Sequence, residues 1–309
     1  MGVNNPKGNS RESVLVFGAN GFLGSVVTKK LYTSGFDVLP VIRPRANKSR
    51  LQALNDKEIL EIEPSSWPEL VSEHIPNAII CSQWNGVSKQ DRENAELQRT
   101  NIAPILDIGV AAKESGVNSF ICFGSQAEAK ESAETIKEEF YDSGETAYGN
   151  IKAKLHTQLE SLFKNSDCRF IWARVFSVYG PSDFSDSLLM QLFQSQASGT
   201  ELKISNPLKL WSYLYEDDFA SAIEYILKNP TFSSTINVGG PNLNEIREIV
   251  AMWFENSRPD LAHDHTSTTN VGFFPEVKKL MTMGWTPSIS LEEGIKRTRK
   301  AFSDRVNSR

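Results

Sequence analysis

The chain has 309 residues, of which 39% are hydrophobic and 23% charged, and its formal net charge is −5. This length is typical of one large domain or two modest ones, with enough apolar residues to bury a substantial core. The slightly acidic composition excludes the basic surface with which proteins bind nucleic acid, and it also excludes disordered and low-complexity classes. The sequence has no apolar run of about 18 residues and no signal peptide, so we expect no membrane span and a cytoplasmic location. The polar ends, residues 1–10 and 304–309, are expected to be flexible tails.

Predicted strands and helices alternate from the N-terminus. Short runs rich in β-branched and aromatic residues predict strands at Ser13–Phe17, Asp37–Ile42, Ala78–Cys81, Ser119–Phe123 and Arg169–Val175. Pro40 weakens the second of these predictions. Apolar residues at helical spacing predict helices from Phe22 to a stop at Gly35, over Asn94–Ser115 and over Tyr148–Lys164. This alternation predicts an α/β fold, a doubly wound parallel sheet with helices on both faces.

A glycine-rich segment, Gly18-Ala-Asn-Gly21-Phe-Leu-Gly24, joins the first strand to the first helix. Glycines permit a tight turn and a close approach of the backbone to a dinucleotide's pyrophosphate, and the helix N-terminus offers free N–H groups and a partial positive charge. The spacing differs from the commoner G-x-G-x-x-G, and a purely structural turn is the alternative. We expect the cofactor to contact Gly18, Asn20, Gly21, Phe22, Leu23 and Gly24.

The end of the second strand indicates which dinucleotide binds. NAD sites usually place Asp or Glu there, where the carboxylate accepts hydrogen bonds from the adenosine ribose. This chain has Arg43-Pro44-Arg45 instead, and a guanidinium suits the 2′-phosphate of NADP. We therefore expect NADP(H) in preference to NAD(H), bound in part by Arg43, with a solvated basic loop as the alternative.

The alternation of predicted elements stops after the fifth strand, and prolines become frequent. We expect residues 11–176 to form a Rossmann-type dinucleotide-binding domain, to which residues 210–240 return through a strand at Thr235–Val238. Residues 177–209 and 241–303 are expected to form a smaller, mostly helical substrate-binding lobe.

Tyr148 and Lys152 are four residues apart and therefore lie on one face of the predicted helix. A phenol transfers protons poorly at neutral pH unless a cation stabilises the phenolate, which the Lys152 ammonium would do. Ser125 follows the strand Ser119–Phe123, and open α/β sheets assemble their sites at the carboxyl ends of strands. We expect Ser125, Tyr148 and Lys152 to be the catalytic residues, and Tyr148 and Lys152 to contact the cofactor as well.

The three cysteines, Cys81, Cys122 and Cys168, lack the spacing of metal ligands. The first two lie in predicted strands. We expect buried, reduced thiols and no metal site.

These features together resemble a known family, the extended short-chain dehydrogenase/reductases, in the branch of nucleotide-sugar epimerases, dehydratases and ketoreductases. The resemblance covers residues 13–295. Besides the residues already named, its motifs are Arg174–Pro181 (RVFSVYGP), Tyr215–Asp218 (YEDD), Asn237–Gly240 (NVGG) and Met283–Trp285 (MGW). Asn101 and Asp218 also match the family, and we interpret both as structural.

The resemblance implies roles for the three catalytic candidates. Tyr148 would be the general acid/base, Ser125 would hydrogen-bond the reacting oxygen, and Lys152 would support Tyr148 and hold the nicotinamide ribose. The resemblance also implies a homodimer that pairs the helices over Asn94–Ser115 and Tyr148–Lys164 between subunits.

Two departures from the family pattern concern the reaction and the substrate phosphates. Ser125 is followed by Gln126-Ala127-Glu128, whereas the family's dehydratases have an Asp-Glu pair that eliminates water, so a 4,6-dehydratase is disfavoured. Trp211 stands where the family places an arginine that binds the substrate's pyrophosphate. Either Lys209 or Lys278 replaces that arginine, or the substrate is not an ordinary nucleotide sugar.

Further departures place polar and aromatic side chains where substrate is expected. Ser177 replaces a common asparagine, and Gln83 and Trp84 replace small residues after the fourth strand. We expect substrate contacts from Gln83, Trp84, Gln126, Ser177 and Trp211, and a cofactor contact from Gln83 as well.

The sequence therefore predicts an NADPH-dependent reductase of a keto-sugar nucleotide or a related small carbonyl compound, with a 4-keto-6-deoxyhexose as the expected sugar. An NAD-dependent nucleotide-sugar epimerase is the alternative. A dinucleotide-binding sensor without catalytic activity is a third hypothesis, which the presence of Ser125, Tyr148 and Lys152 disfavours.

Overall fold

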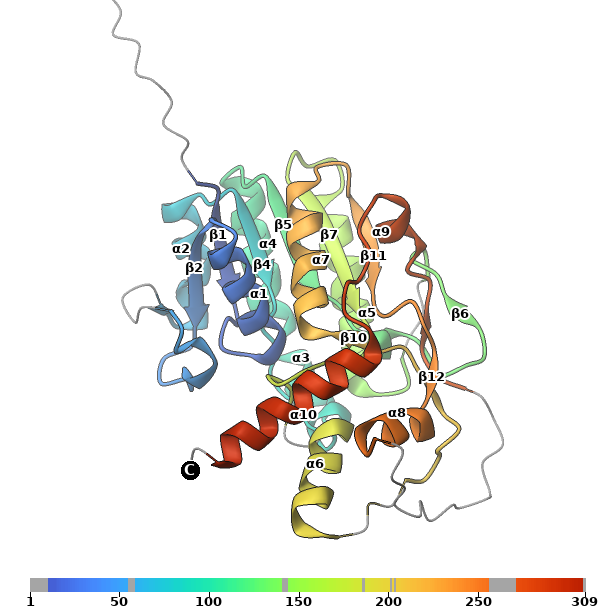
Figure 1. Cartoon of the computed structure of the whole chain (residues 1–309). Coiled ribbons are helices and arrows are strands. Elements are labelled where there is room, and N and C mark those ends of the chain that lie inside the picture. Colours follow the sequence, from blue (N-terminus) through green and yellow to red (C-terminus); the bar gives the residue numbers. More distant parts are fainter. Residues whose placement is uncertain are drawn as a thin grey trace, which may run out of the picture.

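The computed structural model describes residues 11–54, 59–140, 144–184, 187–200, 202, 204–255 and 271–307. Within these residues, the centre of the molecule is a seven-stranded parallel sheet in the order β11-β7-β5-β4-β1-β2-β3 (Figure 1). Its strands are β1 (Ser13–Phe17), β2 (Asp37–Ile42), β3 (Leu60–Glu61), β4 (Ala78–Cys81), β5 (Ser119–Phe123), β7 (Arg169–Val175) and β11 (Ser234–Val238). The α/β fold class predicted from the sequence is confirmed, and the strand expected at Thr235–Val238 is β11.

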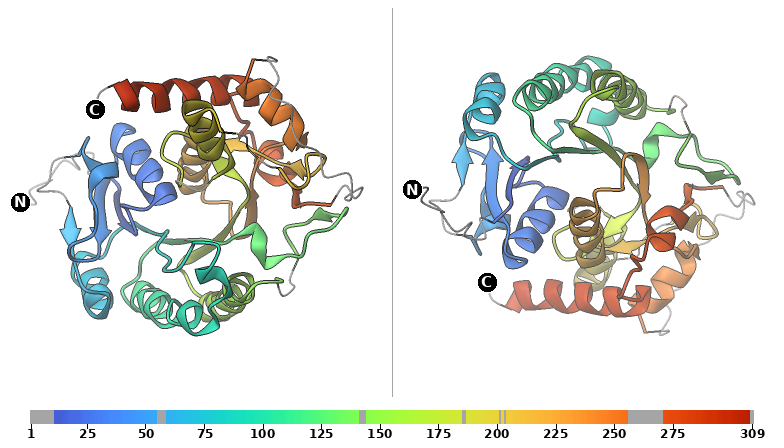
Figure 2. Two further views of the ribbon diagram at one scale, coloured as in Figure 1. Left: turned by 90° about the horizontal axis from the view of Figure 1, so that it is seen from below. Right: turned by 90° about the horizontal axis from the view of Figure 1, so that it is seen from above.

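Helices cover both faces of the sheet, as the views along it show (Figure 2). On one face, α1 (Phe22–Thr33) packs against α7 (Glu216–Lys228). On the other face, α4 (Ile102–Glu114) packs between α2 (Trp67–His74) and α5 (Ala147–Phe163). The sheet is therefore the middle of three layers, as βαβ connections require.

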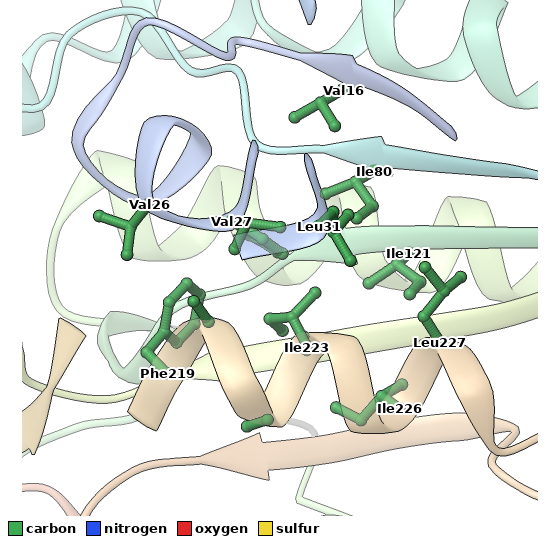
Figure 3. Packing of buried hydrophobic residues seen from close by; sticks show 14 of the residues in the cluster. Val16, Val26, Val27, Leu31, Ile80, Ile121, Phe219, Ile223, Ile226 and Leu227 are labelled. Atoms are coloured by element: carbon green, nitrogen blue, oxygen red, sulfur yellow. The ribbon is translucent and has the colours of Figure 1, made fainter. Parts of the chain in front are cut away.

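Both faces of the sheet bury apolar side chains, because successive residues of a strand point to opposite sides. In β1, Val14 and Val16 belong to the core beneath α1 and α7, whereas Leu15 and Phe17 belong to the opposite core. Figure 3 shows Val16 in the same layer as Ile223 of α7. Complete burial of such a side chain stabilises the fold by about 1.5–3 kcal/mol.

Pro40 lies within β2, opposite Val16 of β1. The outer neighbour β3 pairs only with Val41 and Ile42 of β2. The missing N–H of the proline therefore interrupts no pairing on that side, which is why a strand with an internal proline forms here.

The single helix expected over Asn94–Ser115 is wrong, because the structure has two helices there. α3 (Ala95–Arg99) is separated from α4, which begins at Ile102, by Thr100 and Asn101. Pro104 has no N–H, and its ring clashes with the carbonyl that a continuous helix would place four residues earlier. Asn101 is the N-cap of α4, and its side chain bonds the backbone of Asn85, accepting from its N–H at 2.7 Å and donating to its carbonyl at 3.0 Å. Asn101 thus holds the loop after β4, a structural role as interpreted.

The C-terminal part of the chain adds helices and strand pairs beside the sheet (Figure 1). α6 (Leu188–Ser198), α8 (Ile246–Trp253) and α10 (Leu291–Asn307) share a core that includes Trp253 and Phe302. Short strand pairs join this part to the rest, namely β8 (Val178–Tyr179) with β10 (Leu214–Tyr215), β9 (Leu210–Trp211) with β12 (Asn244–Glu245), and β6 (Thr135–Ile136) with β13 (Phe274–Pro275). The division into a domain and a substrate-binding lobe stays a prediction.

The two expected tails differ in what the structure says of them. α10 continues to Asn307, so residues 304–307 are helical, whereas the sequence led us to expect a flexible end from residue 304. Residues 1–10 and 308–309 lie outside the described residues.

Asp218, near the start of α7, has the structural role interpreted from the sequence. Its carboxylate accepts hydrogen bonds from the N–H and hydroxyl of Ser288, at 2.9 and 2.8 Å, and from the N–H of Ile289 at 2.9 Å. The three bonds tie α7 to the segment that leads into α10.

All three cysteines are buried and free of disulfides. Burial raises the pKa of the Cys81 thiol, and it raises that of Cys168 to about 12. The described residues contain no cluster of three or more His, Cys, Asp and Glu side chains able to hold a metal. None of their helices is long and apolar enough to cross a membrane.

Candidate active site

The glycine-rich segment forms the turn from β1 into α1. Gly18 has a φ of +78°, which favours glycine, and a Cβ there would lie 2.6 Å from the backbone of Gln83. A Cβ at Gly24 would lie 2.2 Å from the Gly18 carbonyl oxygen. The first and third glycines are therefore required by the packing of the turn itself.

The second glycine leaves the N-terminus of α1 open. Gly21 is the N-cap of α1, and no side chain caps the free N–H groups of the first turn. A Cβ at Gly21 would meet only the Gly18 carbonyl oxygen, at 3.3 Å. The turn lies between β1 and β4, where the strand order of the sheet reverses and where open α/β sheets bind their ligands. Open N–H groups at the positive end of the helix dipole fit the pyrophosphate of a dinucleotide.

The side chains of Asn20 and Phe22 contact other groups of the protein, whereas the free N–H groups in the first turn of α1 stay open to a ligand. The Asn20 amide donates to the Asn47 carbonyl at 3.2 Å. The Phe22 ring is buried and packs edge-to-face with Phe184, with 5.8 Å between ring centroids.

Replacing Gly24 by alanine tests the turn. We expect Gly24→Ala to lower the free energy of unfolding by about 2–3 kcal/mol, because its Cβ overlaps the Gly18 carbonyl oxygen. Gly21→Ala, the matched control, should lower it by no more than about 1 kcal/mol. Urea unfolding followed by circular dichroism measures both values. Equal stabilities of the two variants would contradict the packing requirement at Gly24.

The basic turn after β2 carries two exposed arginines, Arg43 and Arg45. The Ala46 N–H donates to the Arg43 carbonyl at 3.2 Å, which closes the turn. Glu61 accepts from the Arg45 N–H at 3.0 Å and pairs with the Lys48 ammonium at 2.6 Å. Arg43 is exposed and has no ion pair within the part of the chain that the structure describes. The choice between NADP and NAD stays a prediction.

Tyr148 and Lys152 lie close together on α5, as their spacing predicts. Their side chains are 8% and 4% exposed. The Lys152 ammonium donates to the carbonyl of Phe123, the last residue of β5, at 2.7 Å. Trp84 follows β4, and its ring lies 3.7 Å from the Lys152 Nζ atom and 5.6 Å from the Tyr148 ring, to which it is nearly perpendicular. The structure therefore brings Trp84 to the expected catalytic pair.

A close contact brings α5 to the segment that contains Ser125. Thr146 caps α5 by accepting from the Gly149 N–H at 3.1 Å. A Cβ at Gly149 would lie only 1.8 Å from the Ala127 carbonyl oxygen, so only glycine permits this approach. The glycine at this position thus sets the distance between Tyr148 and the chain beside Ser125.

Ser125 is the N-cap of a short 3₁₀ helix, η5 (Gln126–Glu128). Its hydroxyl accepts from the Ala127 N–H at 3.2 Å, which leaves the hydroxyl hydrogen free to donate. The Ser177 hydroxyl donates to the Gln126 side-chain carbonyl at 3.2 Å. Two expected substrate contacts, Gln126 and Ser177, are therefore neighbours beside Ser125.

Trp211 lies in a separate cluster on β9. Its ring stacks on Tyr213 at 5.9 Å, and the Lys209 ammonium lies 5.2 Å from the ring and pairs with Glu131. No contact recorded among the described residues joins Trp211 to Ser125 or Gln126. Lys209 is thus paired with Glu131 in a partly exposed ion pair, and Lys278 is an exposed residue at the start of α9 (Lys278–Thr282); replacement of the family's arginine by either lysine stays a prediction.

Comparison with protein families decides the class of protein. The model of the NAD dependent epimerase/dehydratase family matches residues 14–239. The chain belongs to this family. It is an enzyme of the extended short-chain dehydrogenase/reductase type, as the resemblance predicted.

Several known proteins are similar to the chain over most of its length. A GDP-L-fucose synthase from Sinorhizobium fredii is 22% identical over 95% of this chain and 96% of its own. A UDP-glucuronic acid decarboxylase 1 from Xenopus tropicalis is 23% identical over 96% of this chain and 75% of its own. The crystal structure of UDP-glucose 4-epimerase from Thermotoga maritima with UDP-glucose has a TM-score of 0.81 and 21% identity over 95% of this chain and 99% of its own. The crystal structure of dTDP-glucose 4,6-dehydratase from Bacillus anthracis with NAD has a TM-score of 0.82 and 16% identity over 96% of this chain and 98% of its own. These structures share the fold.

Sequence reasoning missed two residues that contact the candidate site. Gln98 is fully buried, accepts from the Trp84 indole N–H at 2.7 Å, and donates to the carbonyls of Gly86 and Asp91 at 2.7 and 2.9 Å. The Arg92 guanidinium carbon lies 5.0 Å from the centre of the Tyr148 ring. Nothing in the local pattern indicates either contact, because both depend on how the loop after β4 folds back.

Proposed function

We propose that this chain is an NADPH-dependent reductase of a keto-sugar nucleotide, with a 4-keto-6-deoxyhexose as the expected sugar. The observation that carries the proposal is the buried pair of Tyr148 and Lys152 at the carboxyl ends of β4 and β5, beside an open helix N-terminus. The fucose synthase and the decarboxylase named above support a nucleotide sugar as the substrate.

The chemistry divides among three side chains. When bound, the reduced nicotinamide would supply the hydride. Tyr148 donates the proton that the carbonyl oxygen gains on reduction, and the free hydroxyl hydrogen of Ser125 orients that oxygen. The positive charge of Lys152 stabilises the phenolate that Tyr148 becomes when it gives up this proton.

The surroundings of Glu128 disfavour a dehydratase. Its carboxylate is 2% exposed and accepts from the Trp172 indole and the Arg174 guanidinium at 3.0 and 3.1 Å. A carboxylate committed to two buried donors is poorly suited to abstract a proton from a substrate. This supports reduction or epimerisation over elimination of water.

Arg43 is the residue that we expect to favour NADPH over NADH. We expect Arg43→Ala to raise the dissociation constant of NADPH about 10- to 100-fold, since a charge-assisted bond to the 2′-phosphate contributes about 1.5–3 kcal/mol. The constant for NADH should change less than about twofold, because NADH lacks the 2′-phosphate that would pair with Arg43. Fluorescence titration measures both, with Arg11→Ala as an exposed control distant along the chain. Equal effects on NADPH and NADH would contradict the assignment of Arg43.

The nucleotide released on denaturation separates the reductase from the two alternatives. A reductase exchanges its cofactor and consumes added NADPH with a keto-sugar nucleotide. Tightly retained NAD, identified by mass spectrometry, would favour the NAD-dependent nucleotide-sugar epimerase instead. Binding of a dinucleotide without turnover of any keto-sugar nucleotide would favour a sensor.

A homodimer stays part of the proposal. α4 and α5 pack side by side on one outer face (Figure 2). The resemblance to the family supports pairing of these two helices with those of a second copy.

A further inference from the structure

The Lys152 ammonium is covered by neighbouring groups of the protein. The side chain is only 4% exposed, and one of its N–H groups donates to the Phe123 carbonyl. The Trp84 ring lies 3.7 Å from the Nζ atom, and the rings of Tyr148 and Trp172 lie 6.0 and 5.9 Å away. An ammonium is attracted to the face of an indole ring, so the cover over Lys152 is favourable in itself.

Buried polar groups hold the Trp84 ring in this position. Its indole N–H donates to the Gln98 side chain at 2.7 Å, and Gln98 is itself fixed by bonds to the carbonyls of Gly86 and Asp91. The next residue, Asn85, is held at both backbone groups by Asn101. Trp84 is therefore anchored at its side chain and beside its backbone.

The same loop touches the expected pyrophosphate site. The backbone of Gln83, the residue before Trp84, lies so close to Gly18 that a Cβ at Gly18 would be 2.6 Å from it. A dinucleotide that extends from the N-terminus of α1 to Lys152 must therefore pass the base of Trp84. Its ribose cannot reach an ammonium that the protein itself covers.

We propose that Trp84 controls access to Lys152: the indole covers the ammonium and must move before the nicotinamide ribose of the cofactor binds there. The inference rests on the proposed dinucleotide site and is independent of the sugar substrate. For ligands that reach Lys152, the apparent affinity is the intrinsic affinity multiplied by the fraction of molecules in which Trp84 has moved. Ligands that stop at the pyrophosphate bear no such cost.

The reactivity of Lys152 tests the cover without any ligand. Trace acetylation with acetic anhydride, read by mass spectrometry, compares Lys152 with Lys154, an exposed lysine on the same helix. In the wild type we expect Lys152 to react at least about tenfold more slowly than Lys154. In Trp84→Ala the two rates should come within about threefold, whereas Trp84→Phe, which keeps a ring over the ammonium, should stay close to the wild type.

Two ligands test the effect on binding. ADP-ribose carries a ribose beyond the pyrophosphate, and ADP does not. We expect Trp84→Ala to lower the dissociation constant of ADP-ribose about tenfold, equivalent to about 1.4 kcal/mol, and to leave that of ADP within about twofold of the wild type. Calorimetric titration measures both, and circular dichroism checks that the variants fold.

The outcomes are distinct. Weaker binding of ADP-ribose by Trp84→Ala would overturn the proposal and make Trp84 a wall of the ribose site. Equal affinities of wild type and variant for ADP-ribose, including no binding by either, would overturn it as well, as would rapid acetylation of Lys152 in the wild type. A lack of activity toward keto-sugar nucleotides would contradict the proposed function and leave this inference standing.

Discussion

Replacing Tyr148 by phenylalanine is expected to lower the turnover of a keto-sugar nucleotide about 10³-fold, the size of effect that general acid catalysis contributes. The substitution removes only the hydroxyl. The ring would still pack perpendicular to Trp84 and beneath the Arg92 guanidinium, so the fold around Lys152 should persist. Binding of NADPH should therefore change less than about threefold.

Steady-state kinetics and fluorescence titration of NADPH separate the two roles of Tyr148. Tyr32→Phe, at a tyrosine that is 42% exposed on α1, is the matched control and should change neither quantity. Unchanged turnover in Tyr148→Phe would remove Tyr148 from proton transfer. A large loss of NADPH affinity would instead give its hydroxyl a role in holding the cofactor.

Replacing Glu128 by alanine is expected to have the largest effect on stability, a loss of about 3–5 kcal/mol in the free energy of unfolding. Arg174 is 1% exposed, and its guanidinium donates to the Glu128 carboxylate at 3.1 Å. Without that carboxylate, a buried positive charge loses its ion-pair partner, and the Trp172 indole loses its acceptor. The Ser125 N–H, which donates to Glu128 at 2.6 Å, is also released.

Urea unfolding provides the measurement, and the chain offers a matched control. Glu131 lies three residues after Glu128 and forms a partly exposed ion pair with Lys209. Glu131→Ala should lower the free energy of unfolding by no more than about 1 kcal/mol. Glu128→Gln keeps the shape of the side chain and should fall between the wild type and Glu128→Ala. A loss below about 1 kcal/mol in Glu128→Ala would show that Arg174 is satisfied by its other acceptors, among them the Phe140 carbonyl.

The elements of the sheet were predictable because their signals are local. β1 and β5 were predicted with the bounds that the structure has, since each is a short apolar run that must be buried on both faces. Among the elements that were not predicted are β3 and α2. β3 has only two residues, and α2 begins at Trp67-Pro68 with too few apolar residues to show a helical period.

The helix boundary at Thr100–Asn101 shows where local reasoning failed. The apolar spacing continues across it, and only the backbone chemistry of Pro104 interrupts the helix. The side chain of Asn101, at this boundary, binds the loop that follows β4. A pattern along one helix carries no information about that loop.

The sequence by itself determined the parallel α/β sheet, the glycine turn at its centre, and Tyr148 and Lys152 on one helix face. Those features follow from periodicity, from the spacing of residues along a helix, and from the conformations that glycine permits. Only the tertiary structure decided that Trp84 covers Lys152, that Gln98 anchors Trp84, and that Glu128 turns inward to Arg174. Each of these contacts joins residues from different elements, and its energy depends on burial and hydrogen-bond geometry that no single stretch of sequence contains.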